Sequence, residues 1–396
     1  MPINNLPSQK IDLIYIEGPG DVVEAFTRWK KQEDVLTETS RTFSSQVFDF
    51  SKNNNISSLF ISTHADKKND RYLNLAAENM PKKMFSGGLG YHLSQLIYGV
   101  RILGICLRHR PRYLHVTSGV THWIMLAPLK LIGINIFPQF HNTLWPKGFP
   151  PTGIKDKVIL ALNGWFLKHI ATATVCCSPE IRSQINQISD NPTCADIQFR
   201  AQFYRQNFEN PPAPPAHNAR PFNIVFAGRI ERNKGVFDLL SMAENLQLQD
   251  VIFHICGGGP AEEALKAECD KRNLNNRVII HGKLKRPDLL AVYNQGHAVI
   301  VPTRSDFCEG LPMVAIEAIL LGRPVITSRL SNALDVLTDA IVEAQPNDMQ
   351  SYVQVIEKLM SDNHFYMQKC QACNKYREPF LDGSQGLTRV LAQTLL

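Results

Sequence analysis

The sequence predicts two α/β domains, each built on a parallel β-sheet, that face each other across a cleft. A chain of 396 residues is too long for one ordinary hydrophobic core, which indicates two domains of roughly 200 residues each. Short β-rich runs alternate with helical patterns along the chain, as in βαβ units with parallel strands. A proline-rich segment near the middle separates two such series.

The N-terminal half contains five runs that we expect to be strands. They are residues 11–16, 57–62, 113–117, 134–140 and 172–177, with helical patterns over 90–108 and 157–169. The first apolar run, residues 13–16, is too short for the hydrophobic region of a secretion signal. It is therefore predicted to be the first strand.

Residues 210–221 read Asn-Pro-Pro-Ala-Pro-Pro-Ala-His-Asn-Ala-Arg-Pro. Proline cannot donate to a strand ladder and stiffens the chain toward polyproline II, so this segment is the expected domain boundary. We therefore predict domains at 1–209 and 222–377, joined by a linker at 210–221. The last helix, within 378–396, is expected to pack back on the N-terminal domain.

A second α/β series follows the linker. Its expected strands are 222–227, 251–256, 277–281, 298–301 and 324–327, and its expected helices are 235–246, 260–272, 287–294 and 312–321. Ligands of open α/β sheets bind at the carboxyl ends of the strands, so the cleft between the domains is the expected binding site.

Composition is that of a soluble globular enzyme, with 44% hydrophobic and 20% charged residues. The longest apolar runs are interrupted by Arg101 and Lys130, so no membrane-spanning helix is expected. The nine cysteines lack paired spacing, which favours a reducing compartment, and the lone Cys370-x-x-Cys373 has no second pair for zinc. We expect a cytoplasmic protein without a metal site.

Positive charge is concentrated in the N-terminal half. Residues 1–200 carry 22 Lys and Arg against 15 Asp and Glu, a net charge of +7, whereas residues 201–396 carry 20 against 21. No Asp or Glu occurs between Asn79 and Lys155. Such a field attracts phosphate, a nucleotide or anionic lipid, although a solvated basic face is the simpler alternative.

The first chemical motif is Gly228-Arg229-x4-Lys234-Gly235, which follows a β-rich run and precedes a helix. Two cations beside the positive end of a helix form a site for an anion. Arg229 can bind a diphosphate with two hydrogen bonds, while Lys234 adds a compact charge. A surface loop is the alternative interpretation.

The second motif places Glu309 and Glu317 eight positions apart, across Gly310 and the start of an apolar helix. Gly310 allows a ligand to approach the backbone closely. Glu317 lies among Val, Ala, Ile and Leu residues, where an unpartnered charge would be costly. A carboxylate there could accept hydrogen bonds from both hydroxyls of a ribose.

These motifs, in this order, closely resemble glycosyltransferase family 4. The order continues with Gly257-Gly258-Gly259-Pro260, residues 278–282, and Gly322-Arg323-Pro324-Val325. The resemblance is dense over residues 222–330 and loose over the N-terminal half. It implies the GT-B fold, with two Rossmann-like domains, and transfer with retention of anomeric configuration.

The resemblance also implies roles for individual residues. Arg229 and Lys234 would hold the donor diphosphate, Glu309 would lie near the transferred sugar, and Glu317 would bind the ribose. Further donor contacts would come from Gly228, Gly258, His281, Gly282, Lys283, Gly310, Leu311, Pro312 and Met313. In the N-terminal half, Gly18 and Gly20 would lie near the diphosphate, and His141 would contact the donor sugar or the acceptor.

The expected activity is therefore a retaining glycosyltransferase that uses a nucleotide diphosphate sugar, with UDP the commonest base among similar enzymes. No Asp-x-Asp occurs in the sequence, so no metal or other cofactor is implied. The alternatives are a nucleotide-sugar epimerase or a glycosidic phosphorylase of the same fold, and a non-catalytic binding protein with two α/β lobes.

The expected partners are the nucleotide-sugar donor and a hydroxyl acceptor that 1–209 would bind. A glycan, a lipid-linked saccharide and a soluble small molecule all remain open as acceptors. The basic stretch 79–155 fits a peripheral contact with an anionic membrane, at its inner face, and no nucleic-acid partner is expected.

Overall fold

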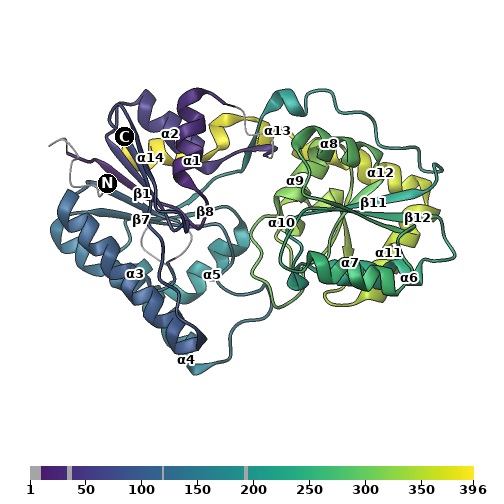
Figure 1. Cartoon of the computed structure of the whole chain (residues 1–396), viewed down its shortest axis with the longest axis horizontal. Helices are drawn as coiled ribbons and strands as arrows, with labels where there is room; N and C mark the ends of the chain where they lie inside the picture. Colours follow the sequence, from purple (N-terminus) through teal and green to yellow (C-terminus); the bar gives the residue numbers. More distant parts are fainter. Residues whose placement is uncertain (1–9, 34–37, 118–119, 191–194) are drawn as a thin grey trace.

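The computed structural model describes residues 10–33, 38–117, 120–190 and 195–396, and these form two α/β domains (Figure 1). The sheet of the N-terminal domain has the strand order β4-β5-β3-β1-β6-β7-β8-β9. All pairs that join these strands are parallel except the one between β4 and β5. The strands are β1 (Leu13–Ile16), β3 (Ser58–Ser62), β4 (Asn69–Tyr72), β5 (Leu75–Asn79), β6 (Tyr113–Val116), β7 (Asn135–Phe140), β8 (Ala173–Cys176) and β9 (Ala195–Gln198).

Helices cover both faces of this sheet, because alternate side chains of each strand point to opposite sides. Leu13 and Tyr15 of β1 pack with helices α1 (Val22–Lys31), α2 (Phe43–Asn53) and α14 (Leu387–Leu395). Ile14 and Ile16 face the other layer. That layer consists of α3 (Gly87–His109), η1 (Trp123–Ile132), α4 (Ile154–His169) and α5 (Pro179–Ser189).

The C-terminal domain contains a six-stranded parallel sheet with the order β13-β12-β11-β14-β15-β16. The strands are β11 (Phe222–Ala227), β12 (Val251–Cys256), β13 (Val278–Gly282), β14 (Ala298–Val301), β15 (Val325–Ser328) and β16 (Ile341–Ala344). Helices α6 (Val236–Asn245), α7 (Glu262–Lys271), α11 (Met349–Ser361) and α12 (Asn363–Cys373) pack on one face. Helices α8 (Arg286–Gln295), α9 (Met313–Leu320), α10 (Ala333–Leu337) and α13 (Glu378–Leu381) pack on the other.

The proline-rich segment packs on the C-terminal domain. The guanidinium of Arg323, which is fully buried, donates hydrogen bonds to the carbonyl oxygens of Pro212 at 2.7 Å and Ala213 at 3.3 Å. The hydroxyl of Tyr366 donates to the carbonyl oxygen of Pro215 at 3.0 Å. These contacts supply partners for a stretch of backbone that makes no sheet ladder.

The chain passes between the domains twice, because it returns through α13 to place α14 on the N-terminal domain. The two passages are bonded to each other. Arg205 makes a bidentate ion pair with Glu378, at 2.7 and 3.0 Å, and the side-chain amide of Gln202 donates to the carbonyl oxygen of Pro379. Both passages lie at the same edge of the cleft (Figure 1).

The predicted fold class is confirmed: the structure is α/β with two parallel-sheet domains. All ten expected strands are present, within two residues at either end. Strands β4, β5, β9 and β16 were not predicted from the sequence, nor was the two-stranded pairing of β2 (Ser40–Arg41) with β10 (Gln202–Phe203). Within the described ranges, no helix is both long and apolar enough to cross a bilayer.

Candidate active site between the two domains

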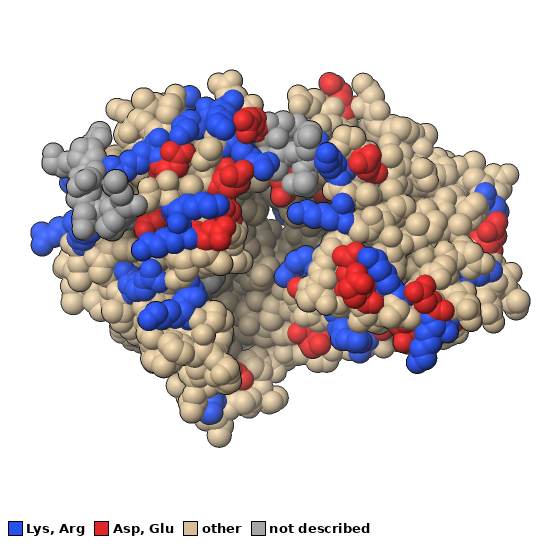
Figure 2. All heavy atoms as spheres, viewed as in Figure 1, with Lys and Arg blue, Asp and Glu red and all other residues tan. Residues whose placement is uncertain are grey.

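A cavity of about 460 Å³ lies between the domains and is lined by residues of both. Figure 2 shows the hollow that separates the two lobes. The walls come from the segments that follow β7 and β11 at their carboxyl ends and from the start of α9. This cavity lies where a ligand of two facing α/β sheets is expected to bind. Ten of the sixteen predicted site residues line it: His141, Gly228, Arg229, Lys234, Glu309, Gly310, Leu311, Pro312, Met313 and Glu317.

The loop after β11 presents the two predicted cations differently. Lys234 is mostly buried, with 17% of its side chain exposed, whereas 65% of the Arg229 side chain is exposed. Arg229 lies at the cavity edge, where its Nη1 is 2.9 Å from Oε1 of Glu231. Gly235 ends the loop at φ 75°, and a Cβ there would meet the carbonyl oxygen of Pro302 at 2.1 Å. Only glycine therefore allows this turn.

Glu309 is the centre of a buried polar network. Its two carboxylate oxygens lie 2.8 and 3.0 Å from Nζ of Lys234, and Thr303 donates its hydroxyl to Oε2 at 2.8 Å. The ammonium of Lys234 also lies 3.9 Å from the centre of the Phe307 ring. The ion pair is shielded from water, so it fixes both side chains in the cavity more firmly than a surface pair would.

The segment around Glu309 contacts the N-terminal domain directly. Gly310 forms an antiparallel bridge with Asn142, and Thr143 donates its hydroxyl to the carbonyl oxygen of Glu309 at 3.2 Å. Asn332 donates its side-chain amide to the same oxygen at 3.1 Å. A Cβ at position 310 would meet the carbonyl oxygen of His141 at 2.0 Å. Glycine is therefore needed for the two domains to approach here.

Glu317 is buried on α9, with 7% of its surface exposed. Tyr293 of α8 donates its hydroxyl to Oε2 at 2.5 Å, and Thr39 of the N-terminal domain donates its hydroxyl to Oε1. Burial raises the pKa of this carboxyl above its usual range, and the two hydroxyl donors partly offset the effect. Glu317 thus already accepts a hydroxyl from across the cleft.

His141 lies at the junction of the cavity with a second one. Its ring packs between Phe43 and Phe199, at centroid distances of 4.6 and 5.7 Å, and the side-chain amide of Gln139 lies 2.9 Å from its Nε2. Burial lowers the pKa of His141 to about 4, so the ring is neutral near pH 7. A neutral ring can form a hydrogen bond with a hydroxyl without carrying charge.

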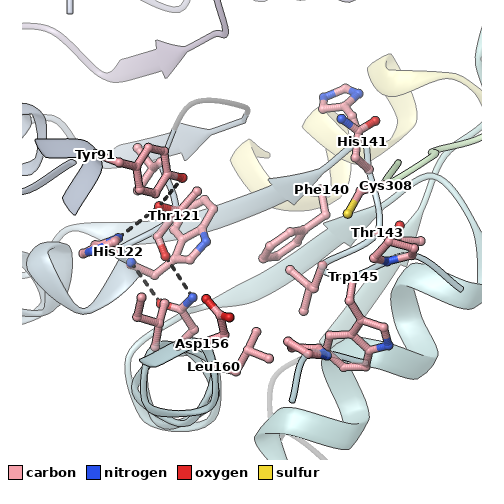
Figure 3. A pocket seen from close by; sticks show the side chains of 18 of the residues that line it. Tyr91, Thr121, His122, Phe140, His141, Thr143, Trp145, Asp156, Leu160 and Cys308 are labelled. Carbon is pink, nitrogen blue, oxygen red and sulfur yellow. Dashed lines mark hydrogen bonds between the residues drawn. The ribbon is translucent and has the colours of Figure 1, made fainter. Parts of the chain in front are cut away.

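The second cavity, of about 530 Å³, belongs mainly to the N-terminal domain and shares His141 and Asn142 with the first. Figure 3 shows it between α3 and α4. Its aromatic lining residues are Tyr91, Trp123, Phe140, Trp145 and Phe149. The Thr121 hydroxyl accepts a hydrogen bond from the hydroxyl of Tyr91 at 3.1 Å. Nδ1 of His92 lies 3.1 Å from Nε2 of His122. Aromatic walls with a few polar groups suit an amphipathic ligand.

Six predicted site residues lie outside the interdomain cavity: Gly18, Gly20, Gly258, His281, Gly282 and Lys283. The His281 ring faces His254 on the neighbouring strand, with their nitrogens 3.0 Å apart. The carbonyl oxygen of Gly258 accepts from the Ile230 amide at 3.1 Å, and that of Gly282 accepts from the Gly257 amide at 2.8 Å. These glycines therefore support the loop that carries Arg229.

The remaining predicted residues, Gly18, Gly20 and Lys283, also do not line the cavity. Gly18 accepts a backbone hydrogen bond from Thr63 at 3.0 Å, and space is open around Gly20. Lys283 lines a separate hollow, which also contains Arg41.

One cluster of possible metal ligands occurs among the described residues: Asp21, His64 and Asp66. Lys68 forms ion pairs with both aspartates, at 3.8 and 3.4 Å. None of these four residues lines either of the two cavities described above.

Sequence reasoning missed several residues that shape the site. Thr39, Tyr293, Thr303 and Asn332 hold the two glutamates, and Asn142 bridges the domains. Each lies far along the chain from the motif, or outside its spacing, so no local pattern marks it. The one available signal was the apolar setting of Glu317, which required a buried partner.

Comparison with known proteins agrees with this architecture. Residues 207–378 match the family described as "Glycosyl transferases group 1". An alpha-D-kanosaminyltransferase of Streptomyces kanamyceticus is 22% identical over 267 residues, which cover 62% of this chain and 66% of that protein. The chain spans 36–66% of the lengths of the first three curated relatives that it matches.

Solved structures match over nearly the whole length. A sucrose-phosphate synthase from Thermosynechococcus elongatus has a TM-score of 0.69 at 14% identity, covering 97% of this chain and 98% of its own. Anabaena HepE, solved in complex with UDP, has a TM-score of 0.67 at 14% identity, covering 97% and 99%. Residues 207–378 are thus similar to the group 1 glycosyl transferases, and the two domains together have the GT-B fold.

Proposed function

We propose that the protein is a glycosyltransferase that takes a sugar from a nucleoside diphosphate donor bound in the interdomain cavity. The observation that carries the proposal is the buried set Lys234, Glu309 and Glu317 around that cavity, in a segment similar to the group 1 family. A cation, a carboxylate at a glycine-containing loop and a second carboxylate about one turn into helix α9 provide separate sites for diphosphate, sugar and ribose.

Lys234 and Arg229 would bind the diphosphate. Both are paired with carboxylates in the structure, so each must turn toward the donor or share its charge when the donor binds. The backbone N–H groups at the start of α9 would add positive potential. Pro312, which caps the helix, contributes none because it has no N–H. Positive groups that are already in place stabilise the negative charge that develops on the leaving diphosphate.

Glu317 would bind the ribose. The donor hydroxyls would replace the Thr39 hydroxyl that Glu317 now accepts, while Tyr293 continues to hold the other carboxylate oxygen. UDP is the proposed nucleotide, supported by the UDP complex of the similar Anabaena protein and by the resemblance to family 4.

The acceptor would occupy the aromatic cavity, with its hydroxyl near His141 where the two cavities meet. The proposed reaction retains anomeric configuration: the acceptor attacks on the face that the diphosphate leaves, and the departing phosphate takes the proton. His141, neutral at pH 7, would position a hydroxyl rather than remove its proton.

A panel of nucleotide sugars tests the proposal directly. The matching donor should raise the thermal midpoint of the protein, by mass action, and the Glu317→Ala variant should lose most of that shift. Release of nucleoside diphosphate should depend on an acceptor and should continue in EDTA, since the proposed mechanism uses no metal.

Three results would favour other functions. Turnover that needs orthophosphate would indicate a phosphorylase, and sugar isomerisation without nucleotide release would indicate an epimerase. Donor binding without turnover across a broad set of acceptors would indicate a binding protein. No donor-dependent shift with any nucleotide sugar would contradict the proposal.

A further inference from the structure

The outward face of α3 is apolar although it is exposed to solvent. Leu89, Leu93, Leu96, Val100 and Leu107 are 40–79% exposed and recur at intervals of three, four and seven residues, which places them on one side of the helix. The opposite side, with Tyr98 and Ile102, packs against the sheet. The helix is therefore apolar on both sides, which is unusual for a helix that faces water.

Helix α4 repeats this arrangement. Ile154, Val158, Leu162 and Trp165 are 44–81% exposed at intervals of three and four residues, while Phe166 packs inward. Both helices pack on η1 and on the same face of the sheet, so their exposed stripes point away from that face together. Leu131 at the end of η1 is 89% exposed and extends the apolar area.

Exposed apolar side chains are concentrated here. Of the twenty-one large hydrophobic side chains that are exposed among the described residues, fifteen lie between Met84 and Trp165. We call the outward faces of α3 and α4, with Leu131, the apolar face. In Figure 2 the lower part of the left-hand lobe, where α3 and α4 lie in Figure 1, is mostly uncharged, whereas the upper part of that lobe carries both basic and acidic side chains.

Basic residues predominate on the segments that form the apolar face, where Asp156 of α4 is the one acidic side chain. No Asp or Glu occurs between Asn79 and Lys155, a stretch with nine Lys and Arg. These are Lys82, Lys83, Arg101, Arg108, Arg110, Arg112, Lys130, Lys147 and Lys155, of which Lys147 forms an ion pair with Asp335 of the C-terminal domain. Two copies of such a face would repel each other, whereas an anionic lipid surface complements both its charge and its apolar side chains.

We propose that the apolar face docks on an anionic membrane surface. The leucines and Trp165 enter the headgroup boundary, and the surrounding lysines and arginines contact lipid phosphates. Docking would also bring the aromatic cavity close to the bilayer, because Tyr91 and His92 of α3 and Leu160 of α4 line it. That last link rests on the proposed function; the docking itself does not.

Vesicle flotation tests the proposal with the whole chain. We expect the protein to float with vesicles of phosphatidylcholine and phosphatidylglycerol, but not with pure phosphatidylcholine, and to be released by high salt. The variant Leu93→Glu/Leu96→Glu/Val100→Glu should bind the anionic vesicles at least about tenfold more weakly. The matched control Leu248→Glu, at a 97% exposed leucine of the other domain, should bind like wild type.

Trp165 gives a second readout that does not need a disruptive variant. Its fluorescence should shift to the blue with anionic vesicles, and Trp165→Phe should lose most of that shift while still floating. Absence of flotation, equal flotation with both vesicle types, or a dimer in solution that the triple variant dissociates would overturn the proposal. Donor binding is measured without vesicles, so failure of docking and failure of the transferase proposal are distinguishable.

Discussion

At the scale of single residues, Lys234 and Arg229 differ in a way that their shared motif does not show. Lys234 is held by Glu309 inside the cavity, whereas Arg229 is exposed at its edge. A buried ion pair that loses one partner leaves an uncompensated charge. The two cations therefore contribute differently to stability, although both are proposed to act on the diphosphate.

The first prediction concerns these two cations. We expect Lys234→Ala and Arg229→Ala each to lower turnover by about a hundredfold or more, the usual loss for a positioned electrostatic donor. Lys234→Ala should also lower the thermal midpoint, because Glu309 becomes unpaired, whereas Arg229→Ala should not. The control is Arg232→Ala, since Arg232 lies outside the cavity; wild-type turnover in both test variants would remove their proposed role.

The second prediction concerns Glu17, whose pKa burial raises to about 7 although Ser44 donates to Oε2 at 2.7 Å. Its folded pKa lies above its unfolded value, so its contribution to stability is present at acidic pH and is lost as pH rises through 7. The Glu17→Gln variant should match wild type near pH 4.5 and be more stable by about 2 kcal/mol near pH 8.

Urea unfolding at several pH values measures this difference. The control is Glu33→Gln, because the Glu33 side chain is 53% exposed. A Glu17→Gln variant that is equally stable or less stable than wild type at pH 8 would contradict the burial argument.

At the scale of elements, the loop that contains Gly310 sets the distance between the domains. The third prediction is that Gly310→Ala lowers turnover by about tenfold or more, because a Cβ would collide with the carbonyl oxygen of His141 in the other domain. Thermal stability should change little, since the domains can separate to relieve the collision.

Small-angle scattering should show a larger radius of gyration for Gly310→Ala than for wild type. Gly383→Ala is the control, because a Cβ there meets nothing closer than Arg41 at 4.0 Å. Unchanged turnover and an unchanged radius of gyration in Gly310→Ala would show that the bridge to Asn142 is dispensable.

Whether a strand could be predicted from the sequence depends on how completely it is buried. Strands such as β14 are buried along their whole length and form continuous apolar runs, so their positions are evident. Strand β4 reads Asn-Asp-Arg-Tyr at an exposed sheet edge and has no such pattern. Strand β16 contains the exposed Glu343, so it does not form a continuous apolar run.

The candidate site divides in a similar way. Lys234, Glu309 and Glu317 belong to segments with a local pattern, so sequence reasoning could name them before the cavity was known. Thr39 and Asn142 reach the same cavity only because the two domains close on each other. Contacts made by domain closure have no local signature, and the apolar faces of α3 and α4 became visible only when burial was known.

At the scale of the whole molecule, Arg323 anchors the first passage between the domains. The fourth prediction is that Arg323→Met lowers the free energy of unfolding by about 3 kcal/mol, because carbonyl oxygens such as that of Pro212 lose their buried donor. The segment 210–221 should also become more sensitive to protease.

Chemical unfolding and limited proteolysis check this prediction. The control is Arg329→Met, because Arg329 is exposed. An Arg323→Met variant with unchanged unfolding and unchanged cleavage of 210–221 would show that the proline-rich segment is held by other contacts.

The two connections between the domains lie at one edge of the cleft and are joined by the ion pair between Arg205 and Glu378. This arrangement restricts how the domains can move. Two adjacent interdomain connections resist sliding and twisting of the domains, but they allow one domain to rotate about the line that joins them. We therefore expect the cleft to open by a hinge rotation about these two connections. The proposed donor would then enter and leave from the side of the cleft opposite the hinge.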